Sequence, residues 1–142
     1  MSLNWKALIS ISKDFYKRAR EEFERAISKN DVIGIRDSAE KAWNAVVQAT
    51  NALILALTNK LPASHFERRR ILRGLEKKYA DIEKLGILDR YMARFKVLHG
   101  ETFYEGIIDV EQLKVDFEKV EKYIKDIEDL SSKILKKTTS SS

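Results

Sequence analysis

Apolar residues recur every three or four positions along most of the chain, which is the spacing of amphipathic α-helices. The first such segment covers about Leu3–Lys29 and the second about Val32–Asn59. The third covers about His65–Leu85, and a shorter fourth covers Ile87–His99. The last begins at residue 109 or 110 and ends near residue 136. No segment alternates apolar and polar residues with a period of two, so we predict an all-α fold.

Turn-forming residues separate these segments. Asp31 follows a short polar stretch and is placed to cap the second helix. Ser64 opens a capping box at the start of the third helix. Gly86 ends that helix, Gly100 ends the fourth, and we expect residues 101–106 to form a loop.

Long helices joined by short connections pack as antiparallel neighbours. We therefore predict an up-and-down antiparallel bundle of four to five helices, forming a single domain over residues 1–137. The second helix is the most apolar and rich in alanine, which suits the central member of the bundle. Residues 138–142 have no apolar side chain to anchor them, and we expect a disordered tail.

Composition narrows the classes of function. The chain has 142 residues, of which 44% are hydrophobic and 35% charged, as in a soluble cytoplasmic domain. It contains no cysteine, two histidines and no glycine-rich phosphate loop, and its acidic residues lack a Glu-x-x-His pair. We therefore expect no metal and no cofactor. The absence of an apolar run of about 18 residues argues against a membrane partner.

Positive charge is concentrated in the third helical segment, in a chain of net charge +5. Such a cluster attracts polyanions such as RNA, although a solvated helix face would have the same composition. The candidate phosphate-binding residues are Arg68, Arg69, Arg70, Arg73, Lys77 and Lys78.

Few other residues have the chemistry for a site. We interpret His65, at a helix start, as a capping-turn histidine, and Trp43, on an apolar stripe, as core. Phe103, Tyr104 and Glu105 fall together in the expected loop, where helical burial does not account for both aromatic rings. We predict that this loop meets a second copy or another protein.

Two long segments carry a resemblance to a known superfamily. The run Phe15–Ala26, the turn Lys29–Asp31 and the alanine-rich stretch 38–57 look like the first two helices of a HEPN domain. Four residues separate Arg94 from His99, and this spacing is similar to the Arg-x(4–6)-His motif of that superfamily. Within it, the segment Leu98–Glu105 resembles the archaeal PaREP-type proteins.

The resemblance implies a fold and two alternative functions. Some HEPN proteins are metal-independent, toxin-like ribonucleases, in which a homodimer brings Arg and His of the motif to the RNA. In chemical terms, a histidine can move the 2′-hydroxyl proton and an arginine can stabilise the charged phosphate. Arg94 and His99 are therefore the candidate catalytic residues, although they point about 140° apart on an ideal helix.

The residue after Arg94 favours the non-catalytic alternative. Catalytic HEPN motifs usually place a polar residue there, and this chain has Phe95. We therefore predict a non-catalytic HEPN-like module that acts through a protein partner or by nucleotide or RNA binding. The resemblance implies a homodimer and, as a possible partner, a separately encoded nucleotidyltransferase. The alternative is the ribonuclease with a dimeric Arg–His site.

Overall fold

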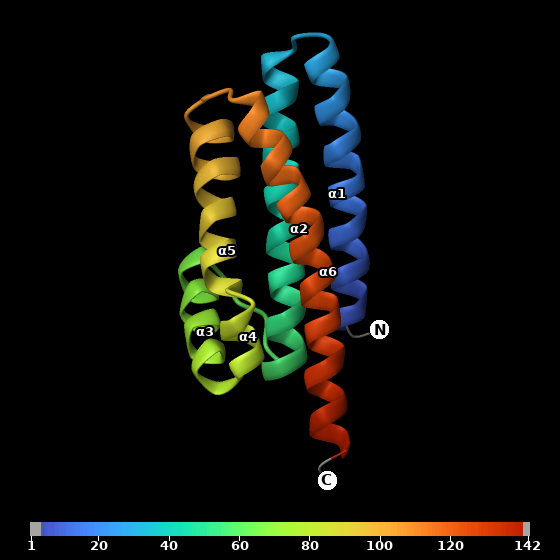
Figure 1. The fold of residues 1–142 in the computed structure, drawn as a ribbon, viewed down its shortest axis with the longest axis vertical. Coiled ribbons are helices and arrows are strands. Elements are labelled where there is room, and N and C mark those ends of the chain that lie inside the picture. The colour runs from blue at the N-terminus through green and yellow to red at the C-terminus, as the bar shows by residue number, and fades with distance from the viewer. Residues whose placement is uncertain (1–3, 141–142) are drawn as a thin grey trace.

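The computed structural model describes residues 4–140, with the backbone alone for residues 138–140 (Figure 1). Every regular element in this range is a helix, so the predicted all-α class is confirmed. The elements are α1 (Trp5–Ser28), α2 (Val32–Thr58), α3 (His65–Lys78), α4 (Ala80–Lys84), α5 (Ile87–Arg94), the π-helix η1 (Phe95–Tyr104) and α6 (Val110–Ser140).

The long hairpin of α1 and α2 agrees with its predicted bounds to within two residues. The Asp31 side chain caps α2, accepting a hydrogen bond of 3.0 Å from the backbone N–H of Gly34. A Cβ atom at position 34 would lie 2.9 Å from the Cβ of Ala26, so the tight approach of the two helices here requires glycine. The hairpin is thus fixed by a cap and by a close backbone contact.

The predicted third and fourth helices differ from the observed elements. The third is interrupted at Tyr79, whose backbone is extended, and its continuation is the short helix α4. This break lets α3, α4 and α5 form a compact group at one end of the bundle (Figure 1). Within residues 4–140 there are six α-helices, so the prediction of four to five helices was too low.

Residues 101–104, most of the expected loop at residues 101–106, are helical, so the prediction of a loop is wrong there. Helical backbone continues through Gly100 to Tyr104 as the π-helix η1. The backbone N–H of Glu105 bonds the carbonyl of Gly100, five residues earlier, at 3.0 Å. Glycine in a helix is only moderately unfavourable, by about 1 kcal/mol, and packing against α2 outweighs that preference here.

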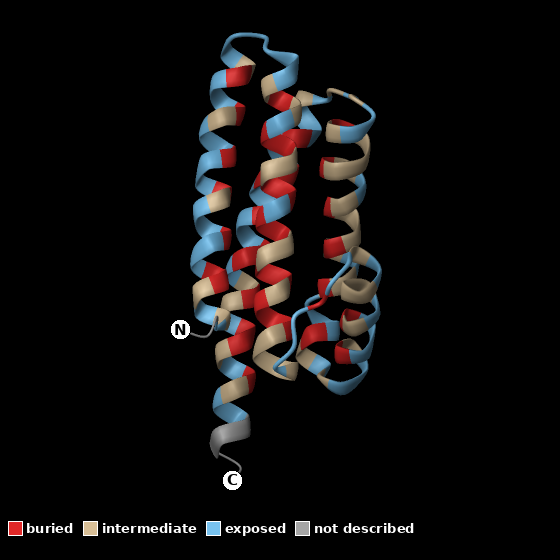
Figure 2. Cartoon of the chain, turned by 180° about the vertical axis from the view of Figure 1, so that it is seen from behind, coloured by how far each residue is buried: buried red, intermediate tan, exposed pale blue. Residues whose placement is uncertain are grey.

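Helix α2 is the central member of the bundle, as predicted. It contacts α1, α3, α5, η1 and α6, and red buried positions line it in Figure 2. Small side chains permit this close approach, and those with no exposed surface are Ala39, Ala42, Ala45, Ala49 and Ala52.

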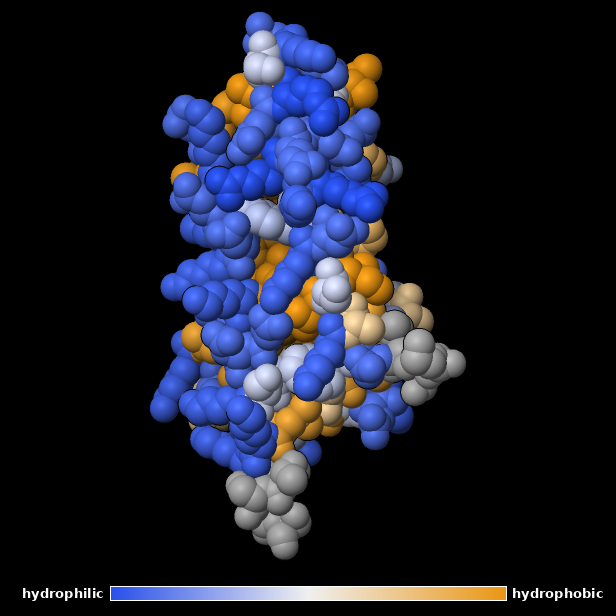
Figure 3. Space-filling view, turned by 90° about the vertical axis from the view of Figure 1, so that its right-hand side faces the viewer, coloured by the Kyte–Doolittle hydropathy of each residue, from blue (hydrophilic) through white to orange (hydrophobic). Residues whose placement is uncertain are grey.

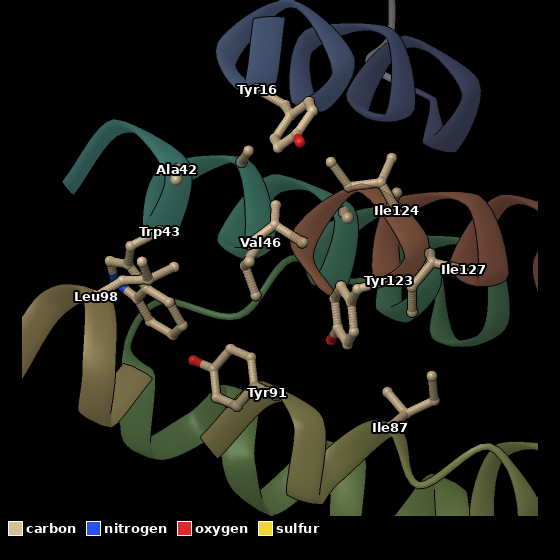
Figure 4. Close-up of a cluster of buried hydrophobic side chains, with 14 of the residues drawn as sticks. Tyr16, Ala42, Trp43, Val46, Ile87, Tyr91, Leu98, Tyr123, Ile124 and Ile127 are labelled. Carbon is tan, nitrogen blue, oxygen red and sulfur yellow. The ribbon is translucent and has the colours of Figure 1, made fainter. Parts of the chain in front are cut away.

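The core extends between α2, α5 and α6 (Figure 4). Tyr91 and Tyr123 are its largest fully buried side chains. The Tyr123 hydroxyl lies 2.6 Å from the hydroxyl of Thr50, which satisfies the polar end of a fully buried ring. Trp43 is also buried in this cluster, which confirms its interpretation as core.

Helix α6 packs along α2 and α1 and runs beyond the bundle at its C-terminal end (Figure 1). The expected tail, residues 138–142, is helical as far as Ser140, and residues 141–142 lie outside the described range. Figure 3 shows the α1 side of the molecule, where charged side chains border a strip of apolar surface. Among the described residues, no helix is long and apolar enough to cross a membrane.

Candidate functional site

The π-helix η1 sets the geometry of the candidate site. Hydrogen bonds in a π-helix reach five residues back, so each turn holds more residues than the 3.6 of an α-helix. Phe95, His99 and Phe103 are spaced by four residues, so their side chains lie on one face of this helical segment. Single π-helical turns are frequent at functional sites.

Four rings stack in a row along this face. We call His65, Phe95, His99 and Phe103 the aromatic ladder. The ring centroids of His65 and Phe95 are 4.0 Å apart, with planes at 12°. Those of Phe95 and His99 are 5.4 Å apart, and those of His99 and Phe103 are 6.1 Å apart. Both histidines of the chain therefore lie in one stack, on either side of Phe95.

Trp43 of α2 lies against the ladder. Its ring centroid is 5.4 Å from that of Phe95 and 6.2 Å from each of the two histidine rings. Because Trp43 is only 5% exposed and packs into the core, it gives the ladder a rigid wall. The rings are thus held from the inside by the centre of the bundle.

Glu40 of α2 orients His99. Nδ1 of His99 lies 2.8 Å from Oε1 and 3.0 Å from Oε2 of the carboxylate. Since an ionised carboxylate only accepts, the Nδ1–H group of His99 donates this bond. Nε2 of the same ring has no hydrogen-bond partner among the described residues and is available to a ligand.

His65 is held by a chain of polar groups. Its Nδ1 lies 2.7 Å from the Tyr91 hydroxyl, which also accepts a bond of 3.2 Å from Nη1 of Arg68. Nε of Arg68 donates in turn to the Asn51 side-chain oxygen at 2.9 Å. Burial, together with the positive charges of Arg68 and Arg69, lowers the pKa of His65 below its ordinary value. This shift favours the neutral ring at neutral pH. His65 lies half-buried at the start of α3, as expected, and it is in addition part of this chain of polar groups.

Arg36 closes the other end of the ladder. Its Nη2 donates to the backbone oxygens of Phe103 at 2.7 Å and Tyr104 at 3.3 Å, and its Nε also bonds Phe103. These carbonyls end the helix and have no intrahelical partner, so the guanidinium acts as a cap. Gly106 follows with φ of 74°, and a Cβ there would lie 3.4 Å from Cζ of Arg36.

The structure does not bring Arg94 and His99 together within the chain. Nε of Arg94 lies 2.6 Å from Oδ1 of Asp116 on α6, and the exposed fractions of the two side chains are 7% and 0%. His99 instead pairs with Glu40 on α2. The two motif residues therefore face different helices, as five positions of helical rotation require.

The predicted phosphate-binding residues divide into two groups. Arg68 is committed to Asn51 and Tyr91, next to the ladder. Four others lie on exposed surface: Arg70, Arg73, Lys77 and Lys78. Arg69 and Arg70 lie over the ring of Phe66, at 5.6 and 5.9 Å from its centroid, and that ring is 57% exposed.

The predicted interface residues lie at the far end of η1. Tyr104 is 76% exposed, Glu105 is exposed and Phe103 is half-buried in the ladder. Tyr104 adds an exposed ring beside the ladder, 6.3 Å from the His99 centroid, and Phe66, which follows His65 in α3, adds a second exposed ring on that helix. No cluster of three potential metal-ligating side chains occurs in the described part of the chain.

Sequence reasoning missed the partners that organise the site. Glu40 and Arg36 belong to a helix with no distinctive spacing, and only the packing of α2 against η1 brings Glu40 to His99 and Arg36 to the carbonyls of Phe103 and Tyr104. From the sequence, Phe95 is a departure from the catalytic motif. In the structure its ring lies between the rings of the two histidines. The sequence feature that could have indicated this contact is the spacing of four positions between Phe95 and His99, which places both on one face of a helix.

The fold and the site define a small all-helical bundle protein with a histidine-containing aromatic face. The model of the archaeal PaREP1/PaREP8 family matches residues 7–127, and the chain belongs to this family. Comparison with curated proteins and with solved structures gives no match.

Proposed function

We propose that the chain is a non-catalytic, HEPN-like helical module that binds single-stranded RNA along the aromatic ladder and the basic face of α3. The observation that carries this proposal is the row of stacked rings, which has the exposed ring of Tyr104 beside His99 and the arginines of α3 beside His65. Proteins that bind single strands combine aromatic platforms for bases with cations for the phosphates.

The chemistry of each end suits one part of a nucleotide. Tyr104 offers an exposed ring on which a base can stack, and Phe66 offers another with two guanidinium groups beside it. Arg70, Arg73 and Lys77 share the face of α3 that carries Phe66, because spacings of three and four lie on one side of a helix. Between the ends, Nε2 of His99 is available for a hydrogen bond.

The test is fluorescence anisotropy with a labelled single-stranded RNA of about 12 nucleotides. Replacing Arg70, Arg73 and Lys77 by Gln should weaken binding at least tenfold and reduce the salt dependence of log K by about 2 for three phosphate contacts. The matched control removes three exposed charges from α1 and its C-cap, in Lys17→Gln, Arg25→Gln and Lys29→Gln. Equal losses in the two triple variants would refute the location of the site.

Stacking is tested separately from charge. Tyr104→Ala should cost about 1–3 kcal/mol of binding free energy if a base stacks on this ring. Tyr104→Phe keeps the ring and should bind as the wild type does. A loss in the phenylalanine variant equal to that in the alanine variant would contradict stacking.

The alternative is a metal-independent ribonuclease, which one observation favours. Glu40 holds Nδ1 of His99 and leaves Nε2 for proton transfer, the arrangement of an oriented general base. Burial of Arg94 against Asp116 weighs against it, because the cation of the motif then lies away from His99. RNA cleavage in the presence of a chelator should be absent from the wild type. Cleavage lost in both His99→Ala and Glu40→Gln would establish the alternative instead.

The homodimer and a nucleotidyltransferase partner stay predictions from the resemblance. The exposed Tyr104 and Glu105 are the surface on which we expect such a contact. A toxin–antitoxin role depends on the ribonuclease alternative and on its test.

A further inference from the structure

A second cationic surface lies between α4, α5 and α6, away from the aromatic ladder. It is an open pocket of about 480 Å³, within the range of about 300–1,000 Å³ typical of small-molecule sites. The charged side chains that line it are Lys84, Asp89, Arg90, Arg94, Lys119, Lys122 and Asp126. Five of these are cations and two are anions, so the lining has a net positive charge.

The two arginines of the pocket are fixed in place from α6. Arg90 pairs with Asp126, Nη2 to Oδ2, at 2.9 Å, and its guanidinium lies 5.3 Å from the centroid of the Tyr123 ring. Arg94 pairs with the fully buried Asp116. The arginines are four residues apart on α5, so both point to the same side of that helix. Each carboxylate occupies only part of a five-donor guanidinium, and the ion pairs hold both planes in position.

The lysines of the pocket are not neutralised by the protein. Lys84, Lys119 and Lys122 are exposed, and among the described residues none has a carboxylate within 4 Å of its ammonium group. Fixed guanidinium groups surrounded by unpaired ammonium groups in a concave surface concentrate anions. Arginine forks also match the oxygen geometry of phosphate.

We propose that this pocket binds a small ligand through a diphosphate group. Arg90 and Arg94 form the ordered floor of the pocket, and Lys119, Lys122 and Lys84 close around the phosphate oxygens. A diphosphate suits the site because its several negative charges match the number of unpaired cations. The inference is independent of RNA binding at the ladder, since no residue is shared between the two surfaces.

The experiment is isothermal titration calorimetry in metal-free buffer with two probes, inorganic pyrophosphate and ADP. We expect saturable binding of pyrophosphate at one site per chain. The variant Lys119→Gln/Lys122→Gln should weaken it at least tenfold. The control Lys114→Gln/Lys125→Gln removes the same charge from α6 outside this pocket and should change binding less than twofold. Both variants alter exposed residues and leave the buried pairs intact.

The two probes distinguish the sources of the diphosphate. Tighter binding of pyrophosphate assigns the pocket to the inorganic ion or to a chain of phosphates, and binding of ADP that is equal or tighter assigns it to a nucleotide. A concentration of about 1 mM is high enough to detect even a weak specific site. The absence of saturable pyrophosphate binding at that concentration would overturn the proposal. Equal weakening in the control variant also overturns it, because general charge would then explain the effect.

Discussion

The buried ion pair between Arg94 and Asp116 gives the sharpest test of the structural reasoning. Asp116→Asn keeps the shape of the side chain and removes its charge. The guanidinium of Arg94, only 7% exposed, would then lie buried without a counter-ion. We expect the variant to fold with a much lower free energy of unfolding.

The magnitude follows from the geometry. Opposite unit charges 2.6 Å apart attract each other by about 6 kcal/mol at an effective dielectric constant of about 20. Desolvation of both groups offsets much of this attraction, yet removal of one partner typically costs about 3–5 kcal/mol because a charge stays buried and unpaired. Asparagine keeps a polar oxygen next to the guanidinium, so we expect the lower end of this range, about 3 kcal/mol, or roughly 10 °C in Tm.

The assay is urea unfolding followed by circular dichroism, with linear extrapolation to water. The control is Asp14→Asn, which removes an exposed ion pair with Arg18 and should cost about 0.5 kcal/mol or less. The double variant Arg94→Met/Asp116→Leu removes both charges and should be more stable than Asp116→Asn. A single variant no worse than the control, or a double variant less stable than the single, would refute the reasoning.

Three further predictions concern the ladder and its surroundings. The pKa of His65 is lower in the folded chain than in the unfolded chain, so the unfolded chain binds the proton more tightly. The stabilising contribution of the neutral His65 ring is therefore complete above about pH 6.5 and is lost as pH falls through the folded-state pKa. His65→Gln should therefore flatten the fall in Tm between about pH 7 and pH 5, and parallel curves would contradict this. Gly106→Ala should destabilise more than Gly86→Ala, because both have positive φ but only Gly106 has Arg36 against it; equal thermal shifts would show that the Arg36 contact is unimportant. Light scattering should give the mass of two chains, and a one-chain mass at high concentration would remove the dimer.

Sequence periodicity predicted the helices because burial of an apolar stripe leaves a repeating pattern. Val32–Thr58 and the start of α6 at Val110 agree with the predicted bounds because caps and apolar spacing indicate the same residues. The break at Tyr79 could not be predicted, since no glycine or proline marks it. It depends on how α3, α4 and α5 pack, which is tertiary information.

The π-helix was outside the reach of sequence patterns for a related reason. Gly100 is an ordinary helix-ending signal, and we placed a loop after it. In the structure helical backbone continues to Tyr104, the rings of Phe95, His99 and Phe103 stack along one face of it, and Arg36 caps the carbonyls at its end. His99 and Phe103 stay candidate site residues from the sequence, and their stacking depends on the packing of η1 against α2, which no sequence pattern shows.

The same helical rotation separates the two motif residues and gives each a different set of partners. On the α2 side, His99 belongs to a stack of rings with a carboxylate behind it. On the α6 side, Arg94 belongs to a buried ion pair at the floor of a cationic pocket. A phosphate at Arg94 would therefore lie on a different surface from a ligand at His99. Cleavage by both residues of one chain would require the Arg94–Asp116 pair to break, so a non-catalytic pair of binding surfaces is the arrangement that this geometry favours.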